Sequence, residues 1–418
     1  MTTHPNPALT SPQPFTSRTS RRLLSLALLT LGLGAVACAG ADDTSPNALV
    51  VSIDSVGGVP HVLNSGTPVR WSLDSTVVIH DAGGEPFGRV TGVVGDWKGG
   101  VYVADAIALR VYRFAPDGSY LGSLGGKGSG PGEFRSLEGL AWVAGKLASL
   151  DAGNGRITLL SSDGEDPPVS IKWQALTGEL TLEQTRPGEA YAPVAVPSAQ
   201  QGRKDTKYLR LIGTGAPDTL PDYGAEVSSS AAVTCVSPGQ IASFSIPFAP
   251  RPYSARAPGN GTVVGSTGAY RLALLDAAGD TVRVMSRDEP PVPVSDAEWA
   301  DAEARWTRFR EQNRGADCDV SSITRPPAMP AFRGTLFDDR GRLWVEAVTT
   351  DGFRLDVFDS TGVLVAEFPA PPRDRSVAMT VRTGRLFWTA ADSLGVQTVH
   401  SARVVEQAAP PDSVASGS

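Results

Sequence analysis

Three histidines remain once the N-terminal segment is set aside, and they are the first candidates for metal or acid–base chemistry: His61, His80 and His400. A tetrahedral metal site needs three or four convergent His, Cys or carboxylate ligands. These histidines are far apart and occupy unrelated positions of the chain, so the sequence does not predict a histidine zinc site. A calcium site of carboxylates and carbonyls stays open, because its ligands can come from distant segments at irregular spacing.

The common motifs of nucleophilic catalysis and phosphate binding are absent from the sequence. It contains no G-x-S-x-G elbow, no H-E-x-x-H helix and no G-x-x-x-x-G-K-[ST] loop. The run Gly126-Lys127-Gly128-Ser129-Gly130-Pro131 breaks the dinucleotide pattern G-x-G-x-x-G at its last position. We interpret these glycines as turn residues, and we predict no catalytic residue.

Cys38 follows an N-terminal segment that has the pattern of an export signal. Arg18, Arg21 and Arg22 precede 15 uncharged, mostly apolar residues (23–37), which are too few for a comfortable membrane span. The end of this run, Ala35-Val36-Ala37-Cys38, resembles a bacterial lipobox, in which the Cys is acylated and becomes the new N-terminus. The position three before the Cys departs from the pattern, since Leu is preferred there, and cleavage after A-x-A by an ordinary signal peptidase is the alternative. We predict lipidation at Cys38.

Cys235 and Cys318 would then lie in an oxidising compartment, where a disulfide is the default expectation. Closing so long a loop would stabilise the fold by about 4 kcal/mol in the chain-entropy model. A pair of free thiols is the alternative. Neither cysteine belongs to a C-x-x-C motif, so redox or zinc chemistry is not indicated.

An internal repeat organises the chain between residues 96 and 164. Asp105, Arg110 and Gly118 return 46 residues later as Asp151, Arg156 and Gly164, with short β runs at matching positions. A period of about 40 to 50 residues built of short strands and Gly or Asp turns is typical of propeller blades. The repeated Asp and Arg have two interpretations: ligand-binding residues at a blade mouth, or residues that hold the shape of a blade, which we favour.

The connector between the two copies carries a specific resemblance. Gly126 to Phe134 reads G-x-G-x-G-P-G-E-F, and V-x-V-A-D with an Arg opening a V-x-x-F strand occurs in the first copy. This combination resembles the NHL-type six-bladed β-propeller, a family that has no single function. Enzymes on related propellers include lyases and lactonases, several of which hold a metal in the axial channel.

We therefore predict an all-β fold, a six-bladed β-propeller over residues 48–406. The expected segments before and after it are a signal peptide (1–37), a tether (38–47) and a disordered tail (407–418) rich in Ala, Pro and Ser. We assign the β run of residues 48–53 to the N-terminal strand that closes the last blade and abolishes an open edge. Residues 71–79 form a further predicted strand.

Blades one and two are predicted at residues 89–124 and 137–173, and later blades are less regular. Val233 and residues 241–244 are assigned to the fourth blade. One insertion helix is expected at about 295–314, where Ser295 and Glu298 form a capping box and Gly315 ends the helix. Its aromatic stripe would pack on a blade edge; a lid or a partner-docking element are the alternatives.

The composition and net charge of the chain limit the kinds of partner that it can bind. The chain has 418 residues, 41% hydrophobic and 19% charged, with a net charge of −7, and loss of residues 1–37 removes three Arg and no acid, leaving −10. So acidic a protein is a poor ligand for nucleic acid, since phosphate neutralisation by Lys and Arg supplies most of that affinity. We expect a monomer that meets the membrane only through its lipid.

Two classes of function stay open. The first is a non-catalytic binding or scaffold propeller anchored in the bacterial cell envelope, on the periplasmic or outer-membrane side, with an unknown protein or small-molecule ligand. The alternative is a metal-dependent lyase or lactonase with its site in the central channel, for which calcium is the candidate metal. We favour the first, because no segment concentrates acid–base or metal-ligand residues.

Overall fold

The computed structural model describes residues 48–172, 182–186, 188–197, 204–221, 231–407 and 415–416. The chain divides into a unit of residues 1–44 and a unit of residues 45–418, and the second is the subject here. The predicted signal peptide (1–37), the tether (38–47) with Cys38, and most of the predicted tail (407–418) lie outside the described residues.

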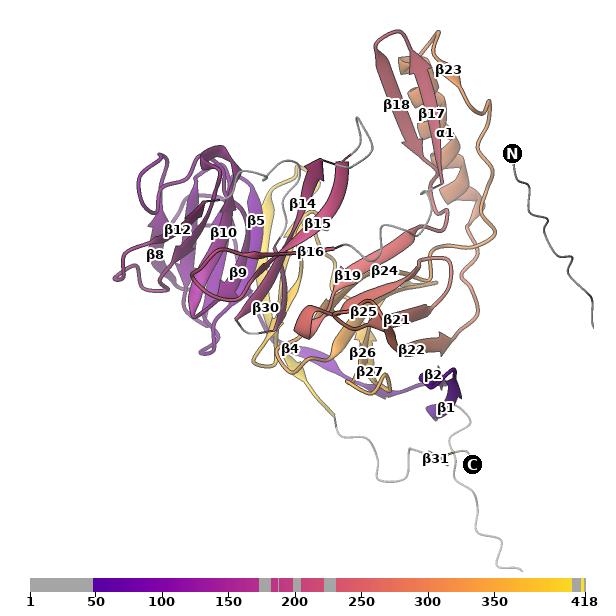
Figure 1. The fold of residues 1–418 in the computed structure, drawn as a ribbon, viewed down its shortest axis with the longest axis horizontal. Coiled ribbons are helices and arrows are strands. Elements are labelled where there is room, and N and C mark those ends of the chain that lie inside the picture. The colour runs from indigo at the N-terminus through magenta and orange to yellow at the C-terminus, as the bar shows by residue number, and fades with distance from the viewer. Residues whose placement is uncertain are drawn as a thin grey trace, which may run out of the picture. The chain divides into compact units, whose positions relative to one another are not determined.

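Each copy of the sequence repeat forms one antiparallel sheet whose four strands follow chain order (Figure 1). The first sheet contains β5 (Val90–Gly95), β6 (Val101–Asp105), β7 (Arg110–Phe114) and β8 (Tyr120–Gly125). The second contains β9 (Glu138–Val143), β10 (Lys146–Asp151), β11 (Arg156–Leu160) and β12 (Val169–Lys172), with a 3₁₀ turn, η1 (Ala152–Asn154), between its middle strands. These sheets confirm the first two predicted blades.

Four further sheets have a similar antiparallel core, but N-terminal strands extend the fourth and the fifth and complete the last. The third has β13 (Glu183–Arg186), β14 (Glu189–Pro197), β15 (Lys204–Leu211) and β16 (Asp218–Pro221). The fourth has β19 (Pro252–Arg256), η2 (Pro258–Asn260), β20 (Thr262–Ser266), β21 (Arg271–Leu275) and β22 (Thr281–Asp288). The fifth has β24 (Phe332–Phe337), β25 (Leu343–Thr349), β26 (Gly352–Phe358) and β27 (Leu364–Pro369). The last has β28 (Thr380–Arg382), β29 (Arg385–Ala391), β30 (Gln397–Val405) and β4 (Ser72–Ile79).

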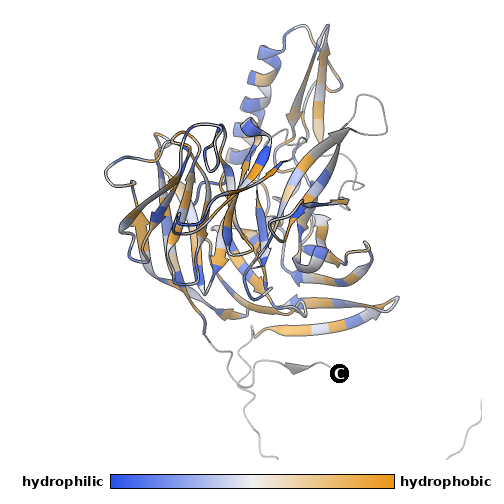
Figure 2. Ribbon diagram, turned by 60° about the vertical axis from the view of Figure 1, so that its left-hand side comes forward, coloured by the Kyte–Doolittle hydropathy of each residue, from blue (hydrophilic) through white to orange (hydrophobic). Residues whose placement is uncertain are grey.

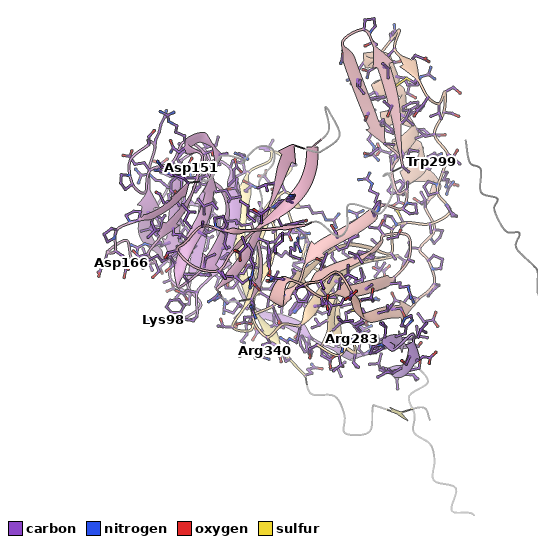
Figure 3. All side chains as sticks on the ribbon, in the orientation of Figure 1. Lys98, Asp151, Asp166, Arg283, Trp299 and Arg340 are labelled. Atoms are coloured by element: carbon purple, nitrogen blue, oxygen red, sulfur yellow. A yellow bond between two sulfur atoms is a disulfide. The ribbon has the colours of Figure 1, made fainter. Side chains whose placement is uncertain are left out.

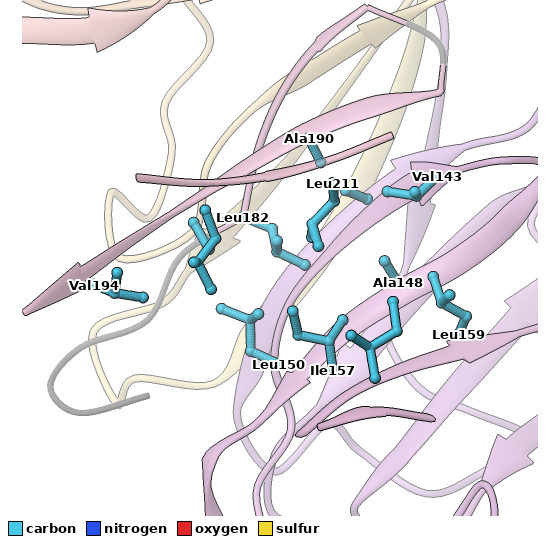
Figure 4. Packing of buried hydrophobic residues seen from close by; sticks show 13 residues of the cluster. Val143, Ala148, Leu150, Ile157, Leu159, Leu182, Ala190, Val194 and Leu211 are labelled. Atoms are coloured by element: carbon cyan, nitrogen blue, oxygen red, sulfur yellow. The ribbon is translucent and has the colours of Figure 1, made fainter. Parts of the chain in front are cut away.

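The apolar residues of successive sheets pack into shared cores, which is how a propeller blade buries its faces. One such core joins Leu150 and Ile157 of the second sheet to Leu182, Val194 and Leu211 of the third (Figure 4). Apolar and polar residues are interspersed along the strands (Figure 2), as expected when side chains point alternately to opposite faces. The fold is a β-propeller, as predicted.

The N-terminal strands follow the rim of three blades. β1 (Val50–Val56) and β2 (Val59–Ser65) form a hairpin in which β2 pairs with β22 of the fourth blade. β3 (Val69–Arg70) then pairs with β27 of the fifth blade, and β4 pairs with β30. An N-terminal strand thus closes the last blade, as predicted.

The assignment of that role to residues 48–53 is wrong. The closing strand is β4, because its residue Ile79 is 4% exposed and packs with Val399 in a core. β1 is exposed along most of its length and borders β31 (Ala415–Ser416) at the outer edge of the fourth sheet. Of the two N-terminal β segments, the one whose apolar face is buried closes the blade.

A separate small sheet interrupts the ring before and after the fourth blade. It contains β17 (Ala232–Ser237), β18 (Gln240–Ser245) and β23 (Asp317–Cys318), so the assignment of Val233 and residues 241–244 to the fourth blade is wrong. Helix α1 (Asp296–Gln312) lies along β17 and β18 (Figure 1), and the predicted capping box is present. The helix ends at Gln312 with Asn313 as its C-cap, so Gly315 does not end it.

The aromatic stripe of α1 does not pack on a blade edge. Trp299, labelled in Figure 3, shares a core with Val233, Cys235 and Trp306, and the Trp306 and Phe244 rings are 5.2 Å apart. The prediction therefore named the wrong sheet as the packing partner of the helix. The reason is that two strands assigned to a blade belong to this insertion. No helix among the described residues combines the length and the apolar character needed to cross a membrane.

Candidate functional site

A cavity of about 380 Å³ lies between the first strands of five blades: β5, β13, β19, β24 and β28. First strands of blades surround the central channel of a propeller, so this cavity is the channel of the ring. Its lining contains six arginines and four acids: Arg186, Arg256, Arg333, Arg373, Arg375 and Arg382, with Glu183, Asp338, Asp339 and Glu346. The excess is positive although the whole chain carries −7.

Three of these arginines gather around one carboxylate, and we name Arg333, Arg373 and Arg375 the arginine cluster. Glu346, on β25, has a side chain only 4% exposed. Arg373 donates from Nη2 and Nε to the two Glu346 oxygens at 2.9 and 3.3 Å, and Arg375 donates from Nη2 at 3.3 Å. The cluster thus holds three positive charges against one buried negative charge.

Arg333 is the member whose charge has no direct partner. Its guanidinium makes no hydrogen bond or ion pair with the described residues and lies 4.4 Å from the centre of the Phe353 ring. The Arg375 guanidinium lies 3.9 Å from the same ring. A ring held against two cations fixes their planes by cation–π attraction, which leaves the donor edge of Arg333 available to another molecule.

Hydrogen bonds to side chains hold the segment that carries Arg373 and Arg375 in place. Asp374, between them, accepts bonds from Ser376 N (2.9 Å), Ser376 Oγ (2.7 Å) and Gln397 Nε2 (2.7 Å). Gln397 in turn accepts the N–H of Val90 at 2.6 Å. Although burial opposes it, these hydrogen bonds and the charge of Arg373 hold the pKa of Asp374 below its usual value. The two arginines therefore start from a fixed backbone.

The surroundings of Arg333, which include another positive charge, lower its pKa. Burial is the largest cause that lowers the pKa of Arg333, and the nearby charge of Arg373 lowers it further. Glu346 and Glu298 act in the opposite sense. An anion placed against Arg333 would relieve this repulsion, so the site has an electrostatic preference for negative charge.

The part of the lining around Arg382 is different in character. Arg382, at the end of β28, lies 5.5 Å from the centre of the Trp142 ring, and its buried Nε has no hydrogen-bond partner among the described residues. Burial lowers the pKa of Arg382, while Asp339 and Asp96 raise it. Two acids near one arginine leave no positive excess there, so the arginine cluster is the stronger anion site.

The predicted disulfide between Cys235 and Cys318 is present, with Cα atoms 4.0 Å apart across β17 and β23. It staples the insertion sheet and lies outside the channel lining. Cys38 lies outside the described residues. None of the three histidines lines the cavity: His400, on β30, stacks on Trp388 at 5.0 Å, and burial and the charge of His80 lower its pKa.

The repeated Asp and Arg hold the blades, as favoured. Asp105 accepts the N–H groups of Gly88, Arg89, Ile107 and Ala108 at 2.7 to 3.1 Å. Asp151, labelled in Figure 3, does the same for the second blade and pairs with Arg156 at 3.4 Å. Arg156 also donates to the carbonyl oxygens of the glycine-rich connector. Each carboxylate thus ties a blade to the connector that enters it.

Within the parts of the chain that the structure describes, no three His, Cys, Asp or Glu side chains come together as metal ligands. The four acids of the channel are instead engaged separately, as in the pairing of Asp338 with Arg342 at 2.6 Å. Among the described residues, the acids of the channel therefore form no carboxylate cluster for a calcium ion.

Sequence reasoning missed the arginine cluster. Its members come from the start of β24 and from the segment before β28, and the counter-charge comes from β25. The one local signal was the run Pro372-Arg373-Asp374-Arg375-Ser376, two arginines around an acid at the entry to a predicted blade.

Comparison with known proteins adds little to this geometry. No protein-family model matches the sequence, and no curated protein matches it. Three solved structures resemble the fold: virginiamycin B lyase from Staphylococcus aureus (9% identity, 80% of this chain and 100% of that one, TM-score 0.40), a member of the DUF4221 family from Bacteroides vulgatus (8%, 82% and 99%, 0.46) and the calcium-binding protein regucalcin from Agrobacterium tumefaciens (12%, 82% and 98%, 0.37). At these TM-scores the resemblances carry no argument about function.

Proposed function

We propose that this protein is a binding propeller whose channel takes a small anionic ligand, a carboxylate or a comparable oxyanion, on the arginine cluster. The observation that supports it is the arrangement of Arg333, Arg373 and Arg375 around the single buried carboxylate of Glu346. Arginine forks match planar oxyanions through paired N–H donors, and such charge-assisted bonds are among the strongest in proteins.

The roles within the cluster differ. Arg373 and Arg375 are held by Glu346 and form the fixed wall of the site. Arg333 has no anionic partner of its own among the described residues, so it would supply the direct bond to the ligand. Glu346 is buried, so solvent screens its contacts with Arg373 only weakly, whereas Arg333 stays exposed to an incoming ligand.

The test is isothermal titration calorimetry of the full chain with acetate, glutarate, sulfate and phosphate, for the wild type and for Arg333→Gln. Loss of a hydrogen bond to a charged group costs about 1.5 to 3 kcal/mol, so we expect the variant to bind its best anion about 10- to 100-fold more weakly. Arg305→Gln is the matched control, because Arg305 is a half-exposed arginine on α1 paired only with Asp301. Equal affinity of wild type and Arg333→Gln, or no binding of any anion, would refute the proposal.

The proposal also includes the predicted location, family resemblance and monomeric state of the protein. An exported protein with a lipid on Cys38 is supported by the disulfide, since such bonds persist in oxidising compartments. Mass spectrometry of the purified N-terminus tests the anchor: an unmodified terminus contradicts it. Membership of the NHL-type group and a monomeric state remain part of the proposal.

The alternative of a metal-dependent lyase or lactonase is not part of this proposal. Its site would need converging oxygen ligands in the channel, and no three of the four acids in the described lining come together as a ligand group. Calcium titration of the full chain, followed by heat of binding, tests that alternative directly.

A further inference from the structure

A second hollow, of about 620 Å³, adjoins the channel and shares Arg373 and Arg375 with it. Arg89, Ile107, Ala391 and Gln397 are among its other lining residues. We name this hollow the side groove. Because the same two guanidinium groups border both spaces, a ligand anchored in the arginine cluster can continue into the side groove without leaving the protein surface.

The side groove is built by three turns that are held in place by hydrogen bonds. Asp105 accepts the N–H groups of Gly88 at 2.7 Å and of Ile107 at 2.9 Å, so one carboxylate fixes two lining residues that lie against each other. Gln397 joins Val90 to Asp374, which lies between the two arginines. A preformed groove costs a ligand little ordering of the protein.

Its chemistry is cationic at one end and aliphatic along the rim. The acid of the lining, Asp374, is saturated by Ser376 and Gln397, whereas Arg375 keeps part of its surface exposed. Ile107 is 69% exposed, and Leu394 and Val396, on the turn that contributes Gly395 to the lining, are 86% and 44% exposed. Large aliphatic side chains so exposed suit an apolar side chain of a partner.

We propose that the side groove receives an extended polypeptide segment whose carboxylate occupies the arginine cluster, while an aliphatic side chain of that segment covers Ile107. This inference rests on the proposed function, since the same arginines anchor the carboxylate. Charge complementarity and the aliphatic rim favour a peptide over an acidic polysaccharide. No aromatic ring lines the described groove, and such rings are the usual platforms for sugars.

The experiment compares four probes by isothermal titration calorimetry on the full chain. They are glutarate, the acetylated hexapeptide Ala-Ala-Leu-Ala-Ala-Glu with a free C-terminus, the same peptide ending in Gln amide, and tetragalacturonate. We expect the acidic hexapeptide to bind at least 10-fold more tightly than glutarate, and the Gln-amide peptide to lose most of this affinity. A control peptide, separate from these four probes, keeps Glu but ends in an amide, and it tells whether the side-chain or the terminal carboxylate is the anchor.

Two variants separate the groove from the cluster. Ile107→Ser should weaken the acidic hexapeptide at least threefold and leave glutarate unchanged, while Ile241→Ser, an equally exposed position on β18, should change neither. If glutarate binds but the hexapeptide gains nothing, or if tetragalacturonate binds more tightly, this inference is overturned and the anion site stands. If no probe binds, the proposed function fails as well.

Discussion

Replacement of Glu346 by Gln should lower the stability of the fold and raise its affinity for anions at the same time. The carboxylate is 4% exposed and accepts three bonds from Arg373 and Arg375. Removing one partner of a buried ion pair costs about 3 to 5 kcal/mol because the other charges stay uncompensated. The Arg373 and Arg375 side chains keep 13% and 32% exposure, so we expect the lower end, about 3 kcal/mol.

The gain in anion affinity follows from the same change of charge. The cluster loses its single negative charge and keeps three positive ones. At an effective dielectric of about 20, removal of a nearby like charge favours a bound anion by at least about 1 kcal/mol, or roughly fivefold in affinity. Anion binding to the folded state would then restore stability, by about 2.7 kcal/mol at 100 times the dissociation constant.

The assay is urea unfolding of wild type and Glu346→Gln, without and with the best anion from the calorimetric series. Glu138→Gln is the matched control, because Glu138 pairs with Arg89 in a contact whose side chains are 25% and 53% exposed. We expect that control to change stability by less than about 1 kcal/mol. A Glu346→Gln protein that is less stable but gains no affinity, and is not rescued by the anion, would show that the cluster is only structural.

Three further outcomes are expected. Deletion of residues 48–70 should leave a folded propeller, whereas deletion of residues 48–80 should abolish folding because β4 completes the last blade. Circular dichroism and soluble yield measure the folding of both proteins. Equal behaviour of the two deletions contradicts the role of β4. Reduction of the disulfide, which spans 83 residues, should lower the free energy of unfolding by up to about 4 kcal/mol, and the double variant Cys235→Ser with Cys318→Ser should lose all sensitivity to reductant. Asp374 has a lowered pKa, so its contribution is complete above the ordinary value of 3.8 and is lost as pH falls through the folded value. Asp374→Asn should therefore flatten the acid limb of the stability profile below about pH 4 relative to wild type, and an unchanged limb contradicts the bracing role.

Much of the fold could be predicted locally. The 46-residue repeat of Asp105 and Arg110, with glycines at the turns, identified two blades, because short strands and tight turns follow from neighbouring residues. Gly118 and Gly164 adopt φ of 88° and 82° at matching turns, a conformation that glycine adopts without strain. The capping box at Ser295 is likewise a contact within one turn.

Pairing across long distances was beyond the sequence. Residues 48–53 and 71–79 both alternate as strands do, and only burial against the last blade decided that β4 closes the ring. Val233 and residues 241–244 have the same local pattern as blade strands, yet α1 and the disulfide draw them into a separate sheet.

The candidate site also separates what the sequence determines locally from what tertiary structure decides. The sequence by itself determined the strands, the turns, the positions of the cysteines and the acidic balance of the chain, because each depends on residue type or near neighbours. The tertiary structure alone decided that Arg373 and Arg375 share the buried carboxylate of Glu346, and that Arg333 and Arg375 share the Phe353 ring. Closure of a propeller brings the first strands of distant blades to one axis, so side chains separated by dozens of residues meet there, and no local pattern records that meeting.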